Sequence, residues 1–397
     1  LYVYTSGTTG LPKAAIVTHR RALQWSCWFA GLLDTSAADR MYDCLPMFHS
    51  VGGVVATGSV LMGGGSVVIR QRFSARRFWD DVVGERCTLF QYIGELCRFL
   101  LQSPSHPLER QHSLRIACGN GLRADVWGAF EERFAIPRIV EFYAATEANF
   151  SLYNCEGKRG SIGRIPPFLP QRTGIELVSL DAESGEPVRG EHGLCVRCAA
   201  GEVGEAIARV RDDARFEGYT DAAASERKLL RDVFVAGDAW FRSGDLMRRD
   251  DAGFFYFVDR TGDTFRWKGE NVSTTEVSET LMLMPGIVDA TVYGVSVAGA
   301  DGRAGMAALV TDERFSMDAL ATWLEGRVPE FARPVFVRLL AGIETTSTFK
   351  PVKRDLARAG FDPAATSDAI YVRERDGAYT RMNAALVERI RAGSIRL

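Results

Sequence analysis

Short apolar runs alternate along the first part of the chain with segments in which apolar residues recur at helical spacing. The runs predict strands at residues 67–69, 88–93, 114–117 and 138–143. The segments between them predict helices at residues 75–86, 95–102 and 124–133. Strands that alternate with helices in this way are typical of α/β layers with parallel strands, because each helix returns the chain to the same edge of the sheet.

The pattern changes after Ser161, where glycine and proline become frequent and the strand-like runs are short, as in residues 181–193. We expect an antiparallel, barrel-like or edge subdomain there. From Phe254 onward the pattern predicts a smaller α+β unit, with strands at residues 254–258, 288–295, 306–311 and 335–339 and helices at residues 274–284 and 317–327. We place a domain boundary near residues 260–263, between a large domain, residues 1–261, and a small domain, residues 262–397.

The chain has 397 residues, too many for one compact core, so two or more domains are expected. Its 48 lysines and arginines nearly balance 50 acidic residues, and the net charge of -2 gives no reason to expect nucleic acid as a partner. No apolar run approaches the roughly 18 residues of a transmembrane helix. The chain begins at Leu1 with a strand-like run that enters a glycine-rich segment. We therefore expect that an N-terminal segment precedes it, and that any membrane anchor lies in that segment.

The 8 cysteines are irregularly spaced, which argues against the disulfide framework of a small secreted protein. Cys195 and Cys198 have the C-x-x-C spacing of some metal and redox sites. No second pair lies nearby, and the flanking residues have a strand pattern. We therefore favour two buried thiols over a metal or redox site.

A glycine- and hydroxyl-rich segment follows the first strand-like run and has the properties of a polyphosphate-binding loop. Glycines permit close approach of the backbone, hydroxyls supply hydrogen-bond donors and a lysine adds a cation. The residues concerned are Thr5, Ser6, Gly7, Thr8, Thr9, Gly10 and Lys13. The segment is not a Walker loop, because Gly7 and Gly10 are too close together and Pro12 precedes the lysine. The alternative is a flexible linker, which has no need of a strand before it or of Pro-Lys after it.

Other residues have side chains suited to nucleotide chemistry. Glu147 follows a predicted strand, where α/β sheets bind ligands, and a carboxylate there suits Mg²⁺. Asp245 has the geometry to accept two hydrogen bonds from a ribose diol. On spacing alone, the simpler interpretations are a surface glutamate, a turn aspartate, an ordinary turn at residues 119–121 and a solvated Lys350.

Taken together and in this order, these motifs resemble those of the adenylate-forming (AMP-binding) superfamily, which includes acyl-CoA synthetases, luciferases and peptide-synthetase adenylation domains. The chain is most similar to the fatty acid transport protein and very-long-chain acyl-CoA synthetase family, over long strings at residues 119–123, 259–273 and 301–307. The resemblance covers nearly the whole chain. It implies a large multi-layer α/β domain with a small β-rich subdomain, plus a smaller, mobile α+β C-terminal domain.

The resemblance also implies roles in the large domain. The segment from Thr5 to Lys13 would hold the triphosphate of ATP, and Gly119, Asn120 and Gly121 would line the adenine pocket. Tyr143 would stack on adenine, Thr146 would contact phosphate and Glu147 would hold Mg²⁺. Phe48 and His49 would line the acyl pocket. The nearby Gly52 and Gly53 permit close approach either of an acyl tail or of neighbouring backbone.

In the rest of the chain, the resemblance implies that Asp245 binds the ribose and that Arg260 reaches the ribose or the phosphates. Gly262 would be the hinge. Lys268 and Gly269 would lie near the pantetheine tunnel, although a plain surface turn is an equally good interpretation. Lys350 would be the catalytic lysine, acting with Thr146 and Glu147.

The implied activity is that of an ATP-dependent fatty acyl-CoA synthetase for long- or very-long-chain acids, with Mg²⁺ as cofactor and coenzyme A as co-substrate. Two alternatives stay open: a fatty acid transport or trafficking protein with little ligase activity, and an adenylation enzyme that loads a carrier protein. We expect a cytoplasmic protein or one bound peripherally to the cytoplasmic face of a membrane. The sequence indicates neither the acyl chain length nor the oligomeric state.

Overall fold

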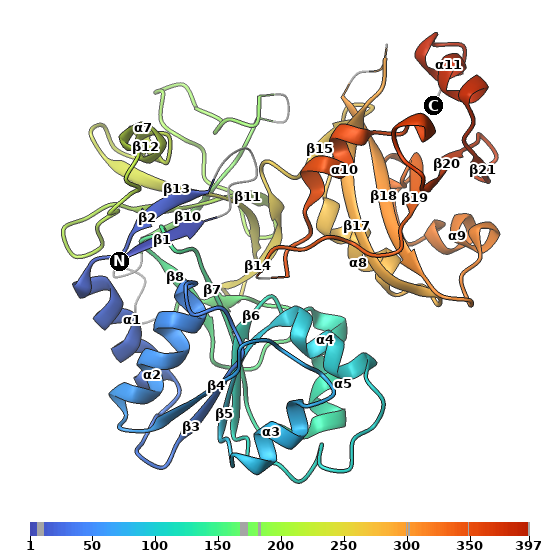
Figure 1. The fold of residues 1–397 in the computed structure, drawn as a ribbon. Helices are drawn as coiled ribbons and strands as arrows, with labels where there is room; N and C mark the ends of the chain where they lie inside the picture. The colour runs from blue at the N-terminus through green and yellow to red at the C-terminus, as the bar shows by residue number, and fades with distance from the viewer. Residues whose placement is uncertain are drawn as a thin grey trace. The chain divides into compact units, whose positions relative to one another are not determined.

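A computed structural model of the chain describes residues 1–5, 12–166, 174–181, 184–298, 300, 302–347 and 349–395. The chain divides into two compact units (Figure 1). The large unit comprises Leu1–Asp181, Glu186–Ser243 and Met247–Phe257. The small unit comprises Ala182–Gly185, Gly244–Leu246 and Val258–Leu397. Contacts thus separate the units at Phe257, and the hinge at Gly262 stays a prediction.

A parallel sheet forms the centre of the large unit, as the alternating pattern predicts. Its strands lie in the order β4-β3-β5-β6-β7: β4 (Ser66–Ile69), β3 (Arg40–Asp43), β5 (Leu89–Ile93), β6 (Ile116–Asn120) and β7 (Ile139–Ala144). The helices around it are α1 (His19–Leu32), α2 (Thr57–Met62), α3 (Phe78–Gly84), α4 (Gly94–Gln102) and α5 (Ala124–Phe134). Phe29 of α1 packs on Phe142, and Phe78 of α3 packs on Phe90. Phe142 and Phe90 point to opposite faces of the sheet, so helices cover both of its sides (Figure 1).

Two predicted boundaries in this region are wrong. Strand β6 was expected to end near Ala117, but it pairs with β5 as far as Asn120, which lies opposite Ile93. The helix expected from residue 75 begins at Phe78. The structure also contains an unpredicted helix, α1, whose N-cap Thr18 accepts a hydrogen bond from the backbone N–H of Arg21.

Beyond β7 the strands run antiparallel and continue the same sheet, which has 12 strands among the described residues. They are β8 (Ser151–Asn154), β9 (Gly163–Arg164), β14 (Phe254–Arg260), β13 (Ala239–Arg249), β11 (Val203–Arg209) and β10 (Ile175–Val178), with β12 (Leu229–Arg231) beside β13. The β-rich region after Ser161 is therefore an extension of the sheet edge. The short helix α7 (Ala222–Glu226) belongs to it. Cys195 and Cys198 are buried free thiols here, as expected.

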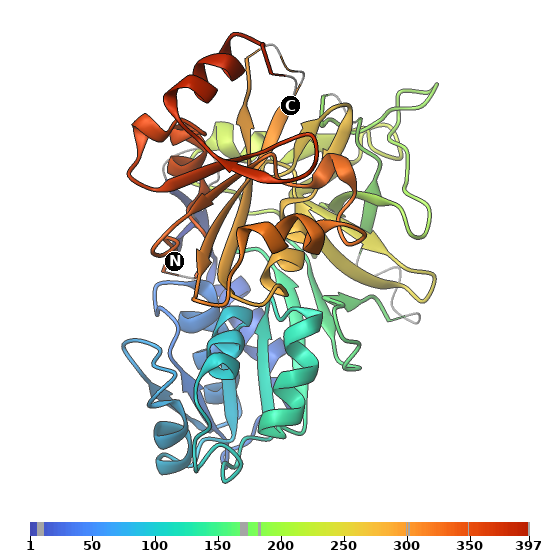
Figure 2. The ribbon, with the colours of Figure 1, turned by 90° about the vertical axis from the view of Figure 1, so that its right-hand side faces the viewer.

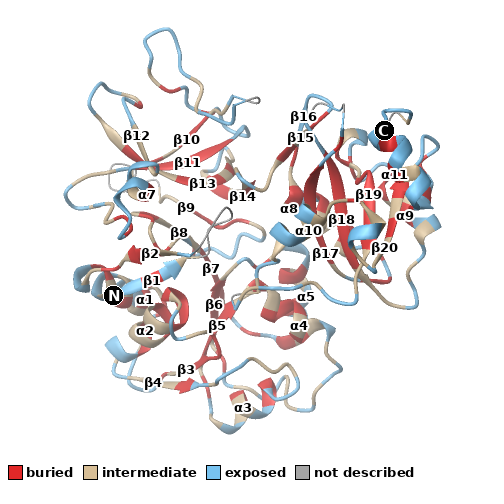
Figure 3. Ribbon diagram, turned by 45° about the horizontal axis from the view of Figure 1, so that its top comes forward, coloured by how far each residue is buried: buried red, intermediate tan, exposed pale blue. Residues whose placement is uncertain are grey.

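The small unit contains a five-stranded sheet in the order β17-β18-β19-β20-β21. These strands are β17 (Ile287–Ser296), β18 (Arg303–Thr311), β19 (Phe336–Leu339), β20 (Ala369–Arg373) and β21 (Tyr379–Arg381). In the part of the small unit that the structure describes, the α-helices are α8 (Thr274–Met282), α9 (Met317–Leu324), α10 (Lys353–Ala359) and α11 (Ala384–Arg391). Helices of this unit lie around its sheet in the orange and red part of the ribbon (Figure 2). Helix α8 ends two residues earlier than expected, and α9 ends three residues earlier, near Gly326, whose φ is +71°. In both units the buried residues are concentrated in the sheets (Figure 3).

Among the described residues, no helix combines the length and the apolar character needed to cross a bilayer.

Candidate active site

The structure describes the two ends of the predicted phosphate loop. Thr5 ends β1 (Tyr2–Thr5), Lys13 begins β2 (Lys13–Ile16), and the two residues are direct partners across this antiparallel hairpin. The Thr5 hydroxyl donates to the backbone carbonyl of Lys13 at 3.3 Å. Ser6, Gly7, Thr8, Thr9 and Gly10 lie outside the described residues. The hairpin therefore fixes both flanks of the predicted loop side by side.

Tyr219 connects this hairpin to the predicted metal ligand, Glu147. The phenol donates a hydrogen bond to Oε1 of Glu147 at 2.8 Å and lies beside the side chain of Thr5. Nζ of Lys13 lies 5.8 Å from the centre of the tyrosine ring. Burial, and then the charge of Glu147, raise the pKa of Tyr219, so it acts as a donor at ordinary pH. Three predicted site residues from distant parts of the sequence thus meet at one tyrosine that the sequence analysis did not single out.

The neighbouring backbone is held by Arg21, at the start of α1. This side chain is 7% exposed and donates to the carbonyl oxygens of Glu147, at 3.3 Å, and of Ala148. Burial lowers the pKa of Arg21 to about 10, while the carboxylate of Glu147 opposes that shift. The hydroxyl of Thr146 hydrogen-bonds to that of Ser50 at 2.9 Å. The segment is therefore fixed from two sides, which keeps both predicted side chains in place.

Glu147 offers one carboxylate, and a single carboxylate is a suitable protein ligand for Mg²⁺. Among the described residues, no cluster of three or more His, Cys, Asp or Glu side chains could enclose a metal ion. Mg²⁺ is commonly bound through one or two carboxylates together with substrate phosphates and water. A single carboxylate beside the flanks of a phosphate loop fits that arrangement.

Glu141 holds the backbone of the predicted adenine-binding segment through hydrogen bonds. It is 1% exposed, and its Oε1 accepts hydrogen bonds from the backbone N–H groups of Gly121 and Leu122, while the Tyr92 phenol donates to Oε2 at 2.6 Å. Burial raises the pKa of Glu141 to about 8. In the sequence, Glu141 is a carboxylate within the apolar run of β7, which is a signal for a buried structural role. That role was not predicted from the sequence.

Glycine is required at two positions of this segment for different reasons. A Cβ on Gly119 would lie 2.3 Å from the ring of Tyr92, which leaves no room for a side chain. Gly121 has a φ of +81°, in the left-handed region that glycine adopts without strain. Asn120 lies between them, and its buried side-chain oxygen has no hydrogen-bond partner among the described residues. The backbone of this segment therefore requires both glycines, one for packing against Tyr92 and one for its conformation.

The residues predicted for the acyl pocket have ordinary local contacts. Nδ1 of His49 accepts from the backbone N–H of Val51 at 3.3 Å, and Phe48 is 68% exposed. A Cβ on Gly52 would meet the carbonyl oxygen of Pro46 at 2.7 Å, and a Cβ on Gly53 that of Met47 at 2.0 Å. These glycines accommodate neighbouring backbone, which decides between the two interpretations left open by the sequence. The pocket role of Phe48 and His49 stays a prediction.

Tyr143, the predicted adenine partner, lies at the end of β7 and is half-buried. Its ring centre is 5.6 Å from that of Phe150. One edge of the tyrosine thus has an aromatic support, and the stacking role stays a prediction.

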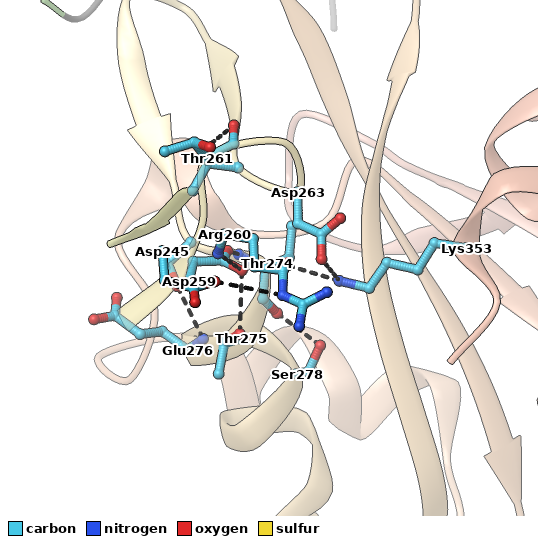
Figure 4. Close-up of polar contacts among 12 residues, drawn as sticks. Asp245, Asp259, Arg260, Thr261, Asp263, Thr274, Thr275, Glu276, Ser278 and Lys353 are labelled. Carbon is cyan, nitrogen blue, oxygen red and sulfur yellow. Dashed lines mark hydrogen bonds and ion pairs between the residues drawn. The ribbon is translucent and has the colours of Figure 1, made fainter. Parts of the chain in front are cut away.

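In the small unit, Asp245 and Arg260 lie side by side (Figure 4). Nε of Arg260 is 3.5 Å from Oδ1 of Asp245, which is 8% exposed. Asp245 lies within β13 and not in the turn that its position after Gly244 suggested. Gly244 has a φ of +77°, and its carbonyl accepts from the backbone N–H of Thr261 at 3.0 Å. The carboxylate and the cation expected to contact the nucleotide are thus held as a pair.

Lys268 and Gly269 form the two-residue turn between β15 (Phe265–Trp267) and β16 (Glu270–Val272). Their φ values, +51° and +86°, are those of a type I′ hairpin turn, which favours glycine at the second position. Lys268 is exposed, with Nζ 5.6 Å from the ring centre of Trp267. The surface-turn interpretation is thus correct for the backbone, and a role near coenzyme A stays a prediction.

Lys350 lies in a tight hairpin that precedes α10. The backbone N–H of Thr346 donates to the carbonyl of Lys350 at 2.8 Å, and the Lys350 N–H donates back to the Thr346 hydroxyl at 3.2 Å. Phe349 has a φ of +59°, which is unusual for a bulky residue and points to a constrained loop. The Lys350 side chain is exposed. The small unit therefore presents the predicted catalytic lysine to solvent on a defined hairpin.

Comparison with known proteins agrees with these features. The AMP-binding enzyme family model matches residues 1–210, and the model of the AMP-binding enzyme C-terminal domain matches residues 276–350. The human long-chain fatty acid transport protein 1 is 46% identical over 402 residues, which cover 100% of this chain and 62% of that protein. The medium/long-chain-fatty-acid–CoA ligase FadD6 of Mycobacterium tuberculosis is 42% identical over 374 residues, which cover 94% of this chain and 62% of that protein. The chain thus spans 62% of the length of these two relatives.

Two solved structures share the fold. ATP-bound MatB from Rhodopseudomonas palustris has a TM-score of 0.74 at 24% identity and covers 90% of this chain and 67% of its own. The O-succinylbenzoate coenzyme A synthetase MenE from Bacillus subtilis, in complex with ATP and magnesium, has a TM-score of 0.70 at 24% identity and covers 89% and 69%. The family-model match over more than half of the residues establishes that the chain belongs to the AMP-binding enzyme family.

Proposed function

We propose that the protein is an ATP-dependent fatty acyl-CoA synthetase for long- or very-long-chain acids, which works through an acyl-adenylate. The observation that carries the proposal is the meeting of Thr5, Lys13 and Glu147 at Tyr219, because it joins the flanks of a phosphate loop to a metal-binding carboxylate. Relatives named as a fatty-acid–CoA ligase and as long-chain fatty acid transport proteins support the substrate class.

The first half-reaction needs charge neutralisation, because the carboxylate and ATP are both anions and a carboxylate is a weak nucleophile. Lys13 and the loop would bind the triphosphate, and Thr146 would contact it. Mg²⁺ bound at Glu147 would neutralise charge on the phosphate oxygens. Asp245 would accept hydrogen bonds from the ribose hydroxyls. The neighbouring Arg260 would partly neutralise the negative charge of that carboxylate.

Lys350 would bridge the substrate carboxylate and the α-phosphate. The carboxylate oxygen attacks the α-phosphorus, the bond to the bridging oxygen breaks, and pyrophosphate leaves. The charge that moves onto the phosphoryl oxygens in this step lies next to the ammonium group, which stabilises the transition state more than the ground state.

In the second half-reaction the thiol of coenzyme A attacks the acyl carbon of the mixed anhydride. The C–O bond to AMP breaks, AMP leaves, and the thiol proton passes to solvent. We propose that the small domain rotates about Gly262 between the two steps, which withdraws Lys350 and brings the turn at Lys268 and Gly269 toward the pantetheine.

A half-reaction assay tests this assignment. Lys350→Ala should abolish acyl-adenylate formation, read as hydroxamate trapping or pyrophosphate release, while thioester formation from supplied acyl-adenylate stays near the wild-type rate. Arg354 is exposed and its side chain makes no hydrogen bond or ion pair with the described residues, so Arg354→Ala is a matched control. Equal loss of both half-reactions in Lys350→Ala would count against the role of this lysine.

The names of the relatives also favour a second candidate, a fatty acid transport protein with little ligase activity. AMP release that depends on both ATP and fatty acid distinguishes the two, and a panel of medium- to very-long-chain acids defines the acyl class. Offering coenzyme A and a carrier protein as competing acceptors tests the remaining alternative.

A further inference from the structure

Lys353 follows the predicted catalytic lysine by three positions and is the first residue of α10. Its Nζ donates to the hydroxyl of Thr274 at 2.8 Å and lies 3.6 Å from Oδ2 of Asp263 (Figure 4). The side chain of Lys353 is 22% exposed and that of Asp263 is 24% exposed. Both are mostly out of solvent, so their attraction is screened less than that of a surface pair.

Thr274 extends this contact to a buried carboxylate. It is the first residue of α8 and is 0% exposed. Its backbone N–H donates to Oδ2 of Asp259, and its hydroxyl donates to Oδ1 at 3.3 Å. Because the hydroxyl donates to Asp259 and accepts from Lys353, it links the two charges through one oxygen atom. Asp259 is 1% exposed and lies at the N-terminus of α8, where negative charge is favourable.

The two aspartates lie on either side of the predicted hinge, Gly262. Lys353 contacts Asp263 directly and Asp259 through Thr274, so one lysine binds both ends of this short segment (Figure 4). The same lysine is separated from Lys350 by only two residues. The base of the catalytic hairpin and the hinge segment are therefore connected by side chains within the small unit.

Helix α10 gives no local reason for a lysine at this position. A cation in the first turn opposes the helix dipole and is unfavourable there. The N-cap of α10, Val352, makes no side-chain hydrogen bond to the helix. The contacts to Thr274 and Asp263 offset this local cost. Lys353 therefore contributes to the contact with the hinge segment and not to the stability of α10.

We propose that Lys353 is a positioning residue for adenylation: through Thr274 and Asp263 it fixes the hairpin that carries Lys350 to the hinge segment. The proposal rests on the proposed function. Lys353 itself touches no reacting group. It acts by keeping the catalytic lysine in the orientation that the hinge position sets, so that the hairpin and the hinge move together.

Three variants test this proposal: Lys353→Ala, the conservative Lys353→Arg, and Arg354→Ala as the matched control on the next residue. In Lys353→Ala, acyl-adenylate formation should fall by about 10- to 100-fold, the loss that a misplacement of about 1 Å produces. Thioester formation from supplied acyl-adenylate and the KM for ATP should stay near wild type. Lys353→Arg should restore most of the rate. Thr274→Val should reproduce the split between the half-reactions, because it removes the shared hydroxyl.

Hydrogen exchange of the hairpin gives a second readout that does not depend on activity. The backbone N–H groups of Thr346 and Val352 donate to Lys350 and Glu344 within this hairpin. Both should exchange faster in Lys353→Ala than in Arg354→Ala. A wild-type protein that forms no acyl-adenylate refutes the proposed function, and the exchange comparison then decides the role of Lys353 alone. Unchanged exchange, or equal loss of both half-reactions, overturns the inference.

Discussion

Replacement of Glu141 by glutamine tests the electrostatics beneath the predicted adenine-binding segment. Glutamine keeps the shape of the side chain, and its oxygen accepts from the N–H groups of Gly121 and Leu122. Its amide must donate to the Tyr92 phenol oxygen, which reverses the hydrogen bond that the phenol donates to Glu141. Glutamine cannot ionise. The substitution therefore removes one titration from the large unit, and the reversed bond to Tyr92 adds a cost that does not depend on pH.

The magnitude follows from the pKa, which burial raises from 4.5 to about 8. A carboxyl group whose pKa is higher in the folded than in the unfolded state keeps its proton longer when folded. Its contribution to stability is fully present below the unfolded pKa and is lost as the pH rises toward about 8. Each pH unit in this window changes the free energy of unfolding by about 1.4 kcal/mol, with an upper bound of about 5 kcal/mol over the whole window.

The assay is thermal or urea unfolding of the wild type and of Glu141→Gln between about pH 5 and about pH 9.5, followed by tryptophan fluorescence. The difference between the two proteins cancels the groups that they share. The wild type should lose stability relative to the variant as the pH rises, and the difference should level off above about pH 8. A difference that is independent of pH over this range would refute the reasoning.

Three further changes have defined outcomes. Tyr219→Phe removes the hydrogen bond to Glu147, worth about 1 kcal/mol, and should raise the Mg²⁺ concentration needed for half-maximal activity; an unchanged Mg²⁺ titration would contradict this role. Gly269→Ala places a Cβ at a φ of +86° and should lower the unfolding free energy of the small unit by about 1–2 kcal/mol, measured by calorimetry; an unchanged melting temperature would be the wrong result. Asp245→Asn should weaken AMP binding about tenfold by titration calorimetry, since the charged acceptor is lost; wild-type affinity would exclude a ribose contact.

The layered α/β fold could be predicted because its parallel strands are continuous apolar runs between turn signals. Helix α1 could not be predicted from amphipathicity, because some of its polar residues are buried and some of its apolar residues are exposed. Arg21 and Ser26 are buried in it, whereas Leu23 and Trp28 are 58% and 55% exposed. The buried arginine donates to the carbonyl groups of Glu147 and Ala148, which lie far away in the sequence.

The sequence indicated candidate site residues where they form contiguous motifs, as around Thr146 and Glu147, and their roles stay predictions. Tyr219 and the structural role of Glu141 were not predicted, because their partners come from other segments: Tyr219 is 72 residues from Glu147, and Glu141 is 49 residues from Tyr92. The glycines at positions 52 and 53 fitted two interpretations until the carbonyl groups opposite them were located. Contacts of this kind depend on chain topology, which no local pattern contains.

The turn at Lys268 and Gly269 limits how this region can diversify among relatives. Trp267 and Phe265, on the strand before the turn, are 4% and 3% exposed, with Arg266 between them pointing the other way. One residue inserted into the turn would either be absorbed there as a longer loop, or would shift β16 by one position and turn the buried Val272 away from the core. The exposed side chain at position 268 can therefore change more freely than the length of the turn.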